Sequence, residues 1–175
     1  MMFRKIRLFH QNRAGWTLIE MLVAIAITGI IALGASVSMA QVMNSTTRNN
    51  DYTTASRNAM NALHWMSRDA EMAQTISGTA GFPASQNLSM TWRGWDNSNY
   101  TANYTLVAGQ LKRIFSVGST TSTTVIAENI NSSTQKTFCS SVNGTINITV
   151  TSSVGSGARV IDVKQERKIS SRPNL

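Results

Sequence analysis

The sequence predicts an α+β protein, in which a long N-terminal helix is followed by an antiparallel β-sheet domain. Three observations support this fold class: an apolar run near the N-terminus, a stretch with helical spacing of apolar residues, and period-two alternation after residue 87. The 175 residues suffice for one domain with an appended helix. We expect four segments, covering residues 1–15, 16–43, 44–76 and 77–175.

The composition places the chain outside two common classes. Hydrophobic residues make up 42% and charged residues only 14%, which is too apolar for a disordered chain and too poorly charged for an ordinary cytosolic protein. The single cysteine excludes an internal disulfide and a cysteine-based zinc site. Half of the net charge of +8 lies within residues 1–15, on Arg4, Lys5, Arg7 and Arg13.

Residues 16–40 form an apolar run in which Glu20 is the only charged residue. As a helix they would extend roughly 37 Å, enough to cross a bilayer core of about 30 Å. The positive-inside rule places the basic residues before the run in the cytoplasm. Ser36, Ser38 and Ala40 could form a signal-peptidase site, but the run is long for a secretory signal and its glutamate would stay unexplained.

A carboxylate inside hydrocarbon is costly unless it is paired, so Glu20 is a candidate functional residue. The alternative is an acid that reaches the membrane interface from the first turn of the helix. Position alone leaves both interpretations open.

The residues around the glutamate carry a resemblance to a known family. The segment from Ala14 to Ala24, AGWTLIEMLVA, resembles the processing motif of type IV prepilins and of the pseudopilins of type II secretion. The resemblance implies that residues 1–15 are a leader and that prepilin peptidase cuts after Gly15. It also implies that Trp16, where the family usually has Phe, becomes an N-methylated N-terminus, and that Glu20 pairs with the N-terminal amine of a neighbouring subunit.

Small side chains recur every four residues along the apolar run. They form one stripe of the helix, at Ala24, Thr28, Ala32, Ser36 and Ala40. Such stripes let membrane helices approach closely, although an alanine-rich span can also produce the pattern by chance. We expect this stripe to pack against other helices.

Residues 44–76 predict an amphipathic helix that continues the first, with a possible bend over residues 44–51. Its narrow apolar face comprises Ala55, Ala59, Ala62, Leu63, Met66, Ala70 and Ala73. We expect this face to cover a sheet, and the helix to end before Gly78 and the Gly81-Phe82-Pro83 segment.

The remaining residues alternate with period two between turn signals. The expected strands cover residues 88–92, 104–107, 110–117, 124–130, 136–142, 145–151 and 159–164. Ala108-Gly109, Asn143-Gly144 and the segment 155–157 predict turns. A helix covering an antiparallel sheet matches the pilin fold, and residues 58–175 resemble the J-type minor pseudopilin and related minor pilins.

We expect no enzymatic activity, no cofactor and no metal site. His64 is an isolated histidine on the second helix, and Cys139 is expected to be buried and inert. The acids after the helix are scattered, at Asp96, Glu128, Asp162 and Glu166.

A basic segment near the C-terminus could contact nucleic acid together with the tryptophans of residues 92–95. Its basic residues are Lys164, Arg167, Lys168 and Arg172. A solvated terminus and core tryptophans are the favoured interpretation.

Together these features predict a structural minor pilin or pseudopilin, anchored by one helix in the inner membrane and assembled near the tip of a type IV pilus or pseudopilus. Its partners would be prepilin peptidase, other pilin-like subunits and lipid. Two alternatives remain: an adhesive or DNA-binding minor pilin, and a single-pass membrane protein that does not assemble.

Overall fold

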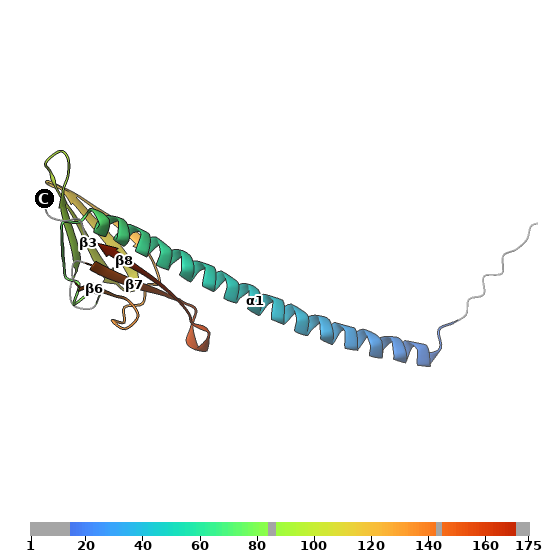
Figure 1. The fold of residues 1–175 in the computed structure, drawn as a ribbon. Coiled ribbons are helices and arrows are strands. Elements are labelled where there is room, and N and C mark those ends of the chain that lie inside the picture. Colours follow the sequence, from blue (N-terminus) through green and yellow to red (C-terminus); the bar gives the residue numbers. More distant parts are fainter. Residues whose placement is uncertain (1–14, 84–86, 143–144, 171–175) are drawn as a thin grey trace, which may run out of the picture. The chain divides into compact units, whose positions relative to one another are not determined.

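The computed structural model describes residues 15–83, 87–142 and 145–170 and has an α+β fold, as predicted (Figure 1). Its elements are helix α1 (Leu18–Met72), strands β1 (Thr75–Ser77), β2 (Leu88–Arg93), β3 (Asn99–Val107), β4 (Gln110–Val117), β5 (Thr120–Ala127), β6 (Phe138–Val142), β7 (Thr145–Val154) and β8 (Ile161–Ser170), and a 3₁₀ turn at Gly157–Arg159. The chain divides into two compact units, before and after the junction between Ser45 and Thr46, which are described separately.

Helix α1 is shorter at its C-terminus than the sequence predicts. Its last turn closes where the amide of Ala73 donates to the carbonyl of Asp69 at 2.9 Å, and the amide of Gln74 then donates across to Thr91. Residues Thr75–Ser77 therefore form β1 instead of a helical turn, because their backbone groups pair with β2. The polar residues 44–51 remain helical.

The first sheet has five antiparallel strands in the order β1-β2-β3-β4-β5. Strand β4 has the predicted bounds, and the predicted Ala108-Gly109 turn joins it to β3 with both residues at positive φ. Strand β5 begins at Thr120 instead of residue 124, because Gly118, at φ +56°, allows a tight turn directly after β4. The strand also ends earlier than predicted, at Ala127 instead of residue 130. Ile130 forms only an isolated bridge to Ser152.

The second sheet has the order β6-β7-β8, so the predicted β-sheet region is two sheets. Glycines 155 and 157 have positive φ in the predicted turn before β8, which begins at Ile161 because residues Gly157–Arg159 form the 3₁₀ turn. Strands β6 and β7 pair as neighbours, with Val142 opposite Thr145. The predicted Asn143-Gly144 turn lies outside the described residues.

The loop after β5 joins the two sheets through main-chain hydrogen bonds. The amide of Ile130 donates to Gly109 in the β3–β4 turn at 2.9 Å. On the other side, the amide of Asn131 donates to Thr151 at 2.9 Å, and that of Ser153 donates to Asn129 at 2.8 Å. One segment thus satisfies backbone groups of both sheets where they meet.

The part of α1 after Thr46 lies along the sheets and completes one continuous core (Figure 1). Its buried residues are Ala55, Ala59, Ala62, Met66, Ser67, Asp69 and Ala70, which include most of the predicted apolar face; Leu63 is half-buried. Alanine at these positions lets the helix backbone approach the strands closely. Both sheets contribute to the core, with Leu88, Met90, Leu111, Ile148 and Val150 among the fully buried side chains.

One carboxyl group in this core fixes the helix to the first sheet. The carboxylate of Asp69, whose side chain is 1% exposed, accepts two hydrogen bonds from Arg113 of β4, at 2.7 Å from Nε and 2.9 Å from Nη2. It also accepts one from the hydroxyl of Tyr104 on β3. Burial and the neighbouring Asp69 carboxylate raise the pKa of Tyr104, so its hydroxyl stays protonated and donates.

Sequence analysis assigned no structural role to Asp69. The available signal was its position three residues after Met66, which places an acid on the apolar face of the helix. Arg113 and Tyr104 are directly opposite each other on β4 and β3, so strand register brings both partners to the same carboxylate.

The substitution Asp69→Ala should lower the free energy of unfolding by about 3–5 kcal/mol, because it leaves the largely buried guanidinium of Arg113 without its partner. Chemical denaturation followed by circular dichroism would measure it. Asp162→Ala is the matched control: Asp162 pairs with Lys136 in an exposed ion pair, whose loss should cost less than about 1 kcal/mol. Equal losses in the two variants would contradict the assigned role of Asp69.

A chain lacking residues 1–43 should fold and remain monomeric, because every contact described above lies after Thr46. Size-exclusion chromatography and amide hydrogen exchange would test this, with protection expected for β3, β4 and β7. An unfolded fragment would show that the domain depends on the apolar half of α1.

Candidate functional site

The unit before residue 46 exposes apolar side chains along its whole described length. All residues from 15 to 45 are exposed, including Leu18 at 84% and Ile30 at 72%. Soluble monomers rarely leave such a continuous apolar surface in water. Helix α1 contains a segment long and apolar enough to cross a membrane, as judged from length and composition.

The predicted site residues lie at the N-terminal end of this helix. Glu20 and Thr17 form a reciprocal cap: the carboxylate Oε2 of Glu20 accepts from the amide and the hydroxyl of Thr17, at 2.9 and 3.0 Å. In return, the amide of Glu20 donates to the hydroxyl of Thr17 at 3.3 Å. This is a capping box, which satisfies backbone donors that a helix N-terminus leaves unpaired.

The cap directs the Glu20 carboxylate back toward the start of the helix, where Gly15 and Trp16 precede the first turn. Sequence analysis treated Glu20 alone and missed Thr17. The threonine-x-x-glutamate spacing at positions 17–20 was the signal that could have identified it.

A shallow apolar groove of about 320 Å³ lies on the helix surface beside Glu20. Its lining residues are Trp16, Ile19, Glu20, Val23, Ala24 and Ile27. The groove therefore places one acid within an otherwise apolar surface.

The predicted small-residue stripe keeps its hydroxyl groups within the helix. Thr28 and Ser36 donate to the carbonyls four residues earlier, on Ala24 and Ala32, at 2.7 and 2.8 Å. These bonds satisfy the hydroxyl donors without any external partner, as an apolar environment requires. A Cβ added to Gly29 or Gly34 would meet nothing within 4 Å, so packing inside the chain does not demand glycine there.

Comparison with known protein families agrees with this arrangement. A family model described as the prokaryotic N-terminal methylation motif matches residues 10–36. The chain carries a prepilin-type motif. The match supports a relation to type IV pilins and pseudopilins, which are structural proteins, and processing by prepilin peptidase. It spans the predicted cleavage junction, Glu20 and the small-residue stripe to Ser36.

No curated protein and no solved structure gives a significant match to the chain. The match to the motif does not distinguish one type of pilin or pseudopilin from another, so the J-type resemblance of residues 58–175 stays a prediction.

The other reactive side chains are dispersed through the domain. Cys139 is buried in β6, and burial raises the pKa of its thiol to about 12, which keeps it protonated and unreactive at neutral pH. His64 is exposed on α1 beside Trp65. Within the described ranges, no three His, Cys, Asp or Glu residues form a group that could hold a metal ion.

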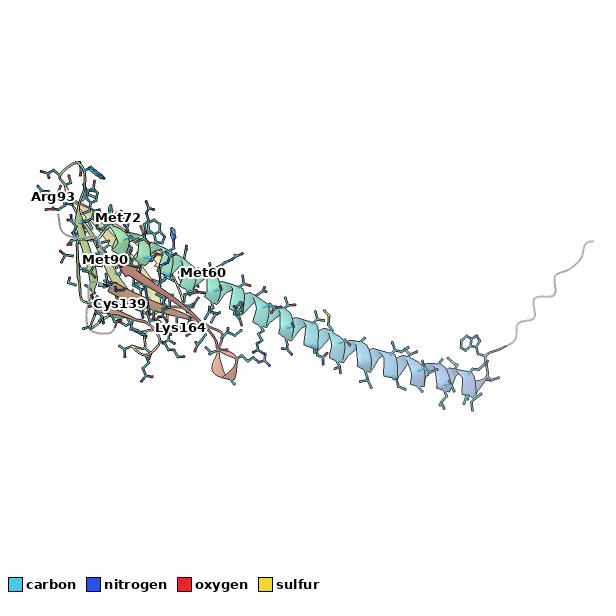
Figure 2. All side chains as sticks on the ribbon, viewed as in Figure 1. Met60, Met72, Met90, Arg93, Cys139 and Lys164 are labelled. Atoms are coloured by element: carbon cyan, nitrogen blue, oxygen red, sulfur yellow. The ribbon has the colours of Figure 1, made fainter. Side chains whose placement is uncertain are left out.

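The structure separates the basic and aromatic residues considered for nucleic-acid binding. Lys164 and Arg93 lie apart in Figure 2, and Arg167 donates to Ser67 of α1 at 2.8 Å. Trp92 packs half-buried against Tyr100 and Phe115, with its ring stacked on Tyr100 at 5.8 Å between centroids. Trp95 is almost fully exposed, at 98%. Arg172 lies outside the described residues.

Mass spectrometry of the membrane form should show a chain that begins at N-methylated Trp16, because the resemblance to prepilins predicts a cut after Gly15 and the matched motif spans this position. The variant Gly15→Leu should retain the leader, since a larger side chain replaces the small residue before the cut. An intact leader in the parent chain, or a start after Ala40, would contradict the assigned junction.

Proposed function

We propose that this chain is a structural minor pilin or pseudopilin subunit, which enters a type IV pilus or type II secretion pseudopilus after prepilin peptidase removes residues 1–15. The observation that carries the proposal is the capped carboxylate of Glu20 inside an exposed apolar surface. It lies in the matched methylation motif, four residues after the proposed new N-terminus at Trp16.

Electrostatics gives Glu20 a role in assembly. Cleavage before Trp16 creates an α-amine, which is positively charged at neutral pH. A carboxylate and an amine in hydrocarbon each cost several kcal/mol when unpaired, and much of that cost is recovered when they pair. Pairing of Glu20 with a neighbour's amine would therefore favour insertion into a filament over residence as a single subunit.

The cap leaves one oxygen of the Glu20 carboxylate for pairing with an amine. Only Oε2 of Glu20 bonds to Thr17, so the second carboxylate oxygen remains available for an incoming amine. The apolar groove beside Glu20 would receive the side chain of the neighbour's first residue. The small side chains of Ala24, Thr28, Ala32 and Ser36 would let the neighbouring helix approach along the same surface.

The presence of the glutamate also bears on position in the filament. The first subunit of a filament has no preceding subunit whose amine a carboxylate could meet. We propose that this chain inserts beneath such a subunit, near the tip. This matches the J-type resemblance of residues 58–175.

The same features support a topology. One membrane-spanning segment with a basic N-terminal flank supports a leader in the cytoplasm and the β-sheet domain outside the inner membrane. The other partners we propose are membrane lipid and further pilin-like subunits. The separation of the basic and aromatic residues disfavours the DNA-binding alternative.

Three variants separate pairing from capping. Glu20→Gln keeps a side chain that can cap the helix but removes the charge, Glu20→Ala removes both, and Thr17→Ala keeps the charge but removes the hydroxyl of the cap. We expect both Glu20 variants to be cleaved and inserted normally. Their crosslinking to other pilin-like subunits in membranes should fall at least tenfold, because a tenfold loss corresponds to a pairing energy of about 1.4 kcal/mol.

Thr17→Ala should crosslink at close to the parent level. If Glu20→Gln captured its partners as well as the parent chain, charge pairing would be refuted. Glu20 would then be a helix-capping residue of a membrane protein that need not assemble.

A further inference from the structure

The face of the first sheet that points away from α1 carries a row of hydroxyl groups. Strand register aligns one residue from each of the five strands in this row, which contains Thr75, Thr91, Thr101, Ser116 and Thr121. Neighbouring strands lie about 4.8 Å apart, so the hydroxyls repeat at nearly the length of one sugar ring in a chain. Their side chains alternate with those of the buried face, such as Met90 and Ala102.

A polar groove lies at the β1 end of this row. It has a volume of about 390 Å³ and is lined by Gln74, Thr75, Thr91, Trp92, Arg93, Asn99 and Thr101. It forms where β1 begins: the side chain of Gln74, just before the strand, accepts from the amide of Arg93 at 3.1 Å and so takes the place of a preceding strand residue. None of these lining residues is acidic.

Arg93 supplies the charge of the groove. The guanidinium group forms no ion pair or hydrogen bond within the described part of the chain, and the residue is exposed. Asn99 lies opposite it on β3, so a cation and an amide flank the same position. Figure 2 shows Arg93 far from Lys164 of β8, so the charge belongs to this end of the sheet.

Next to the groove, the turn between β2 and β3 presents Trp95 to solvent. The amide of Gly94 donates to Ser98 at 2.9 Å. The Asp96 carboxylate accepts from the amide of Ser98 and from the hydroxyl of Tyr100, both at 3.1 Å. These bonds hold the turn in one shape.

Gly94 is also required by packing, because a Cβ there would lie 2.4 Å from the ring of Tyr100. A rigid turn that exposes an indole is pre-organised for binding, because little conformational freedom is lost when a ligand arrives.

We propose that this groove and Trp95 bind a glycan chain whose sugar rings carry carboxylates. The indole would stack on the apolar face of one ring, Arg93 would pair with a carboxylate, and the amides and threonine hydroxyls would bond to ring hydroxyls. This binding site is independent of filament assembly and goes beyond the proposed structural role.

The chemistry of the groove favours a glycan over two other polymers. Single-stranded nucleic acid requires a basic track along its backbone, but the groove offers one cation among neutral hydroxyls and amides. An added peptide strand would require an extended free edge, whereas β1 has only three residues. A pocket lined by hydroxyl and amide groups matches a ligand rich in hydroxyls.

The test uses the full chain in detergent micelles. The detergent has no sugar headgroup, because such a headgroup could itself occupy the groove. Titration calorimetry would compare hexagalacturonate with cellohexaose, its neutral counterpart, and with hexathymidylate. We expect hexagalacturonate to bind at least tenfold more tightly than either. Trp95→Ala and Arg93→Gln should each weaken this binding roughly tenfold, whereas Trp95→Phe should retain most of it.

Two matched controls remove an aromatic residue and a charge elsewhere. Tyr52→Ala alters an exposed ring on α1, and Lys164→Gln removes an exposed cation from β8. Neither should change binding. Equal binding of cellohexaose, preferential binding of hexathymidylate, equal weakening by the controls, or no binding of hexagalacturonate would each overturn the proposal.

Discussion

The domain depends on the buried carboxylate of Asp69. Hydrophobic burial alone would let an alanine-rich helix slide along the sheets, because its small side chains interdigitate weakly. The paired hydrogen bonds from Arg113 and the bond from Tyr104 have strict geometry, so they specify one position of the helix on the first sheet. A buried ion pair adds little net stability, but breaking it is costly because one charge stays buried without its partner. Any other position of the helix on the sheet would break the pair, so the pair favours one position.

A second constraint acts at the other end of the helix. Every described residue before position 46 is exposed, so no contact within the described part of the chain accounts for the apolar character of that segment. Several of its polar groups are nevertheless satisfied internally, through the cap between Thr17 and Glu20 and through the hydroxyls of Thr28 and Ser36. A helix of this kind is suited to hydrocarbon and to close neighbours.

The two proposed sites use charge in opposite surroundings. Glu20 lies beside an apolar groove on a helix suited to hydrocarbon, where an unpaired charge is costly and an incoming amine is therefore strongly favoured. Arg93 lies in solvent beside hydroxyls and amides, where a single charge contributes modestly and several weak bonds must act together. The first arrangement suits permanent assembly between subunits, and the second suits reversible binding of a polar chain.

The sequence by itself determined the fold class, the apolar segment long enough to cross a membrane and the motif around Gly15, because these depend on local pattern: a continuous apolar run, helical or alternating spacing, and turn residues. Strand β4 was predicted to the residue since Gly109 and Gly118 bound it. Only the tertiary structure decided the division into two sheets, the loss of the last helical turn to β1, the partners of Asp69 and the groove beside Arg93. Each of these depends on strand register, which brings together residues far apart in the chain and leaves no periodic signal in the sequence.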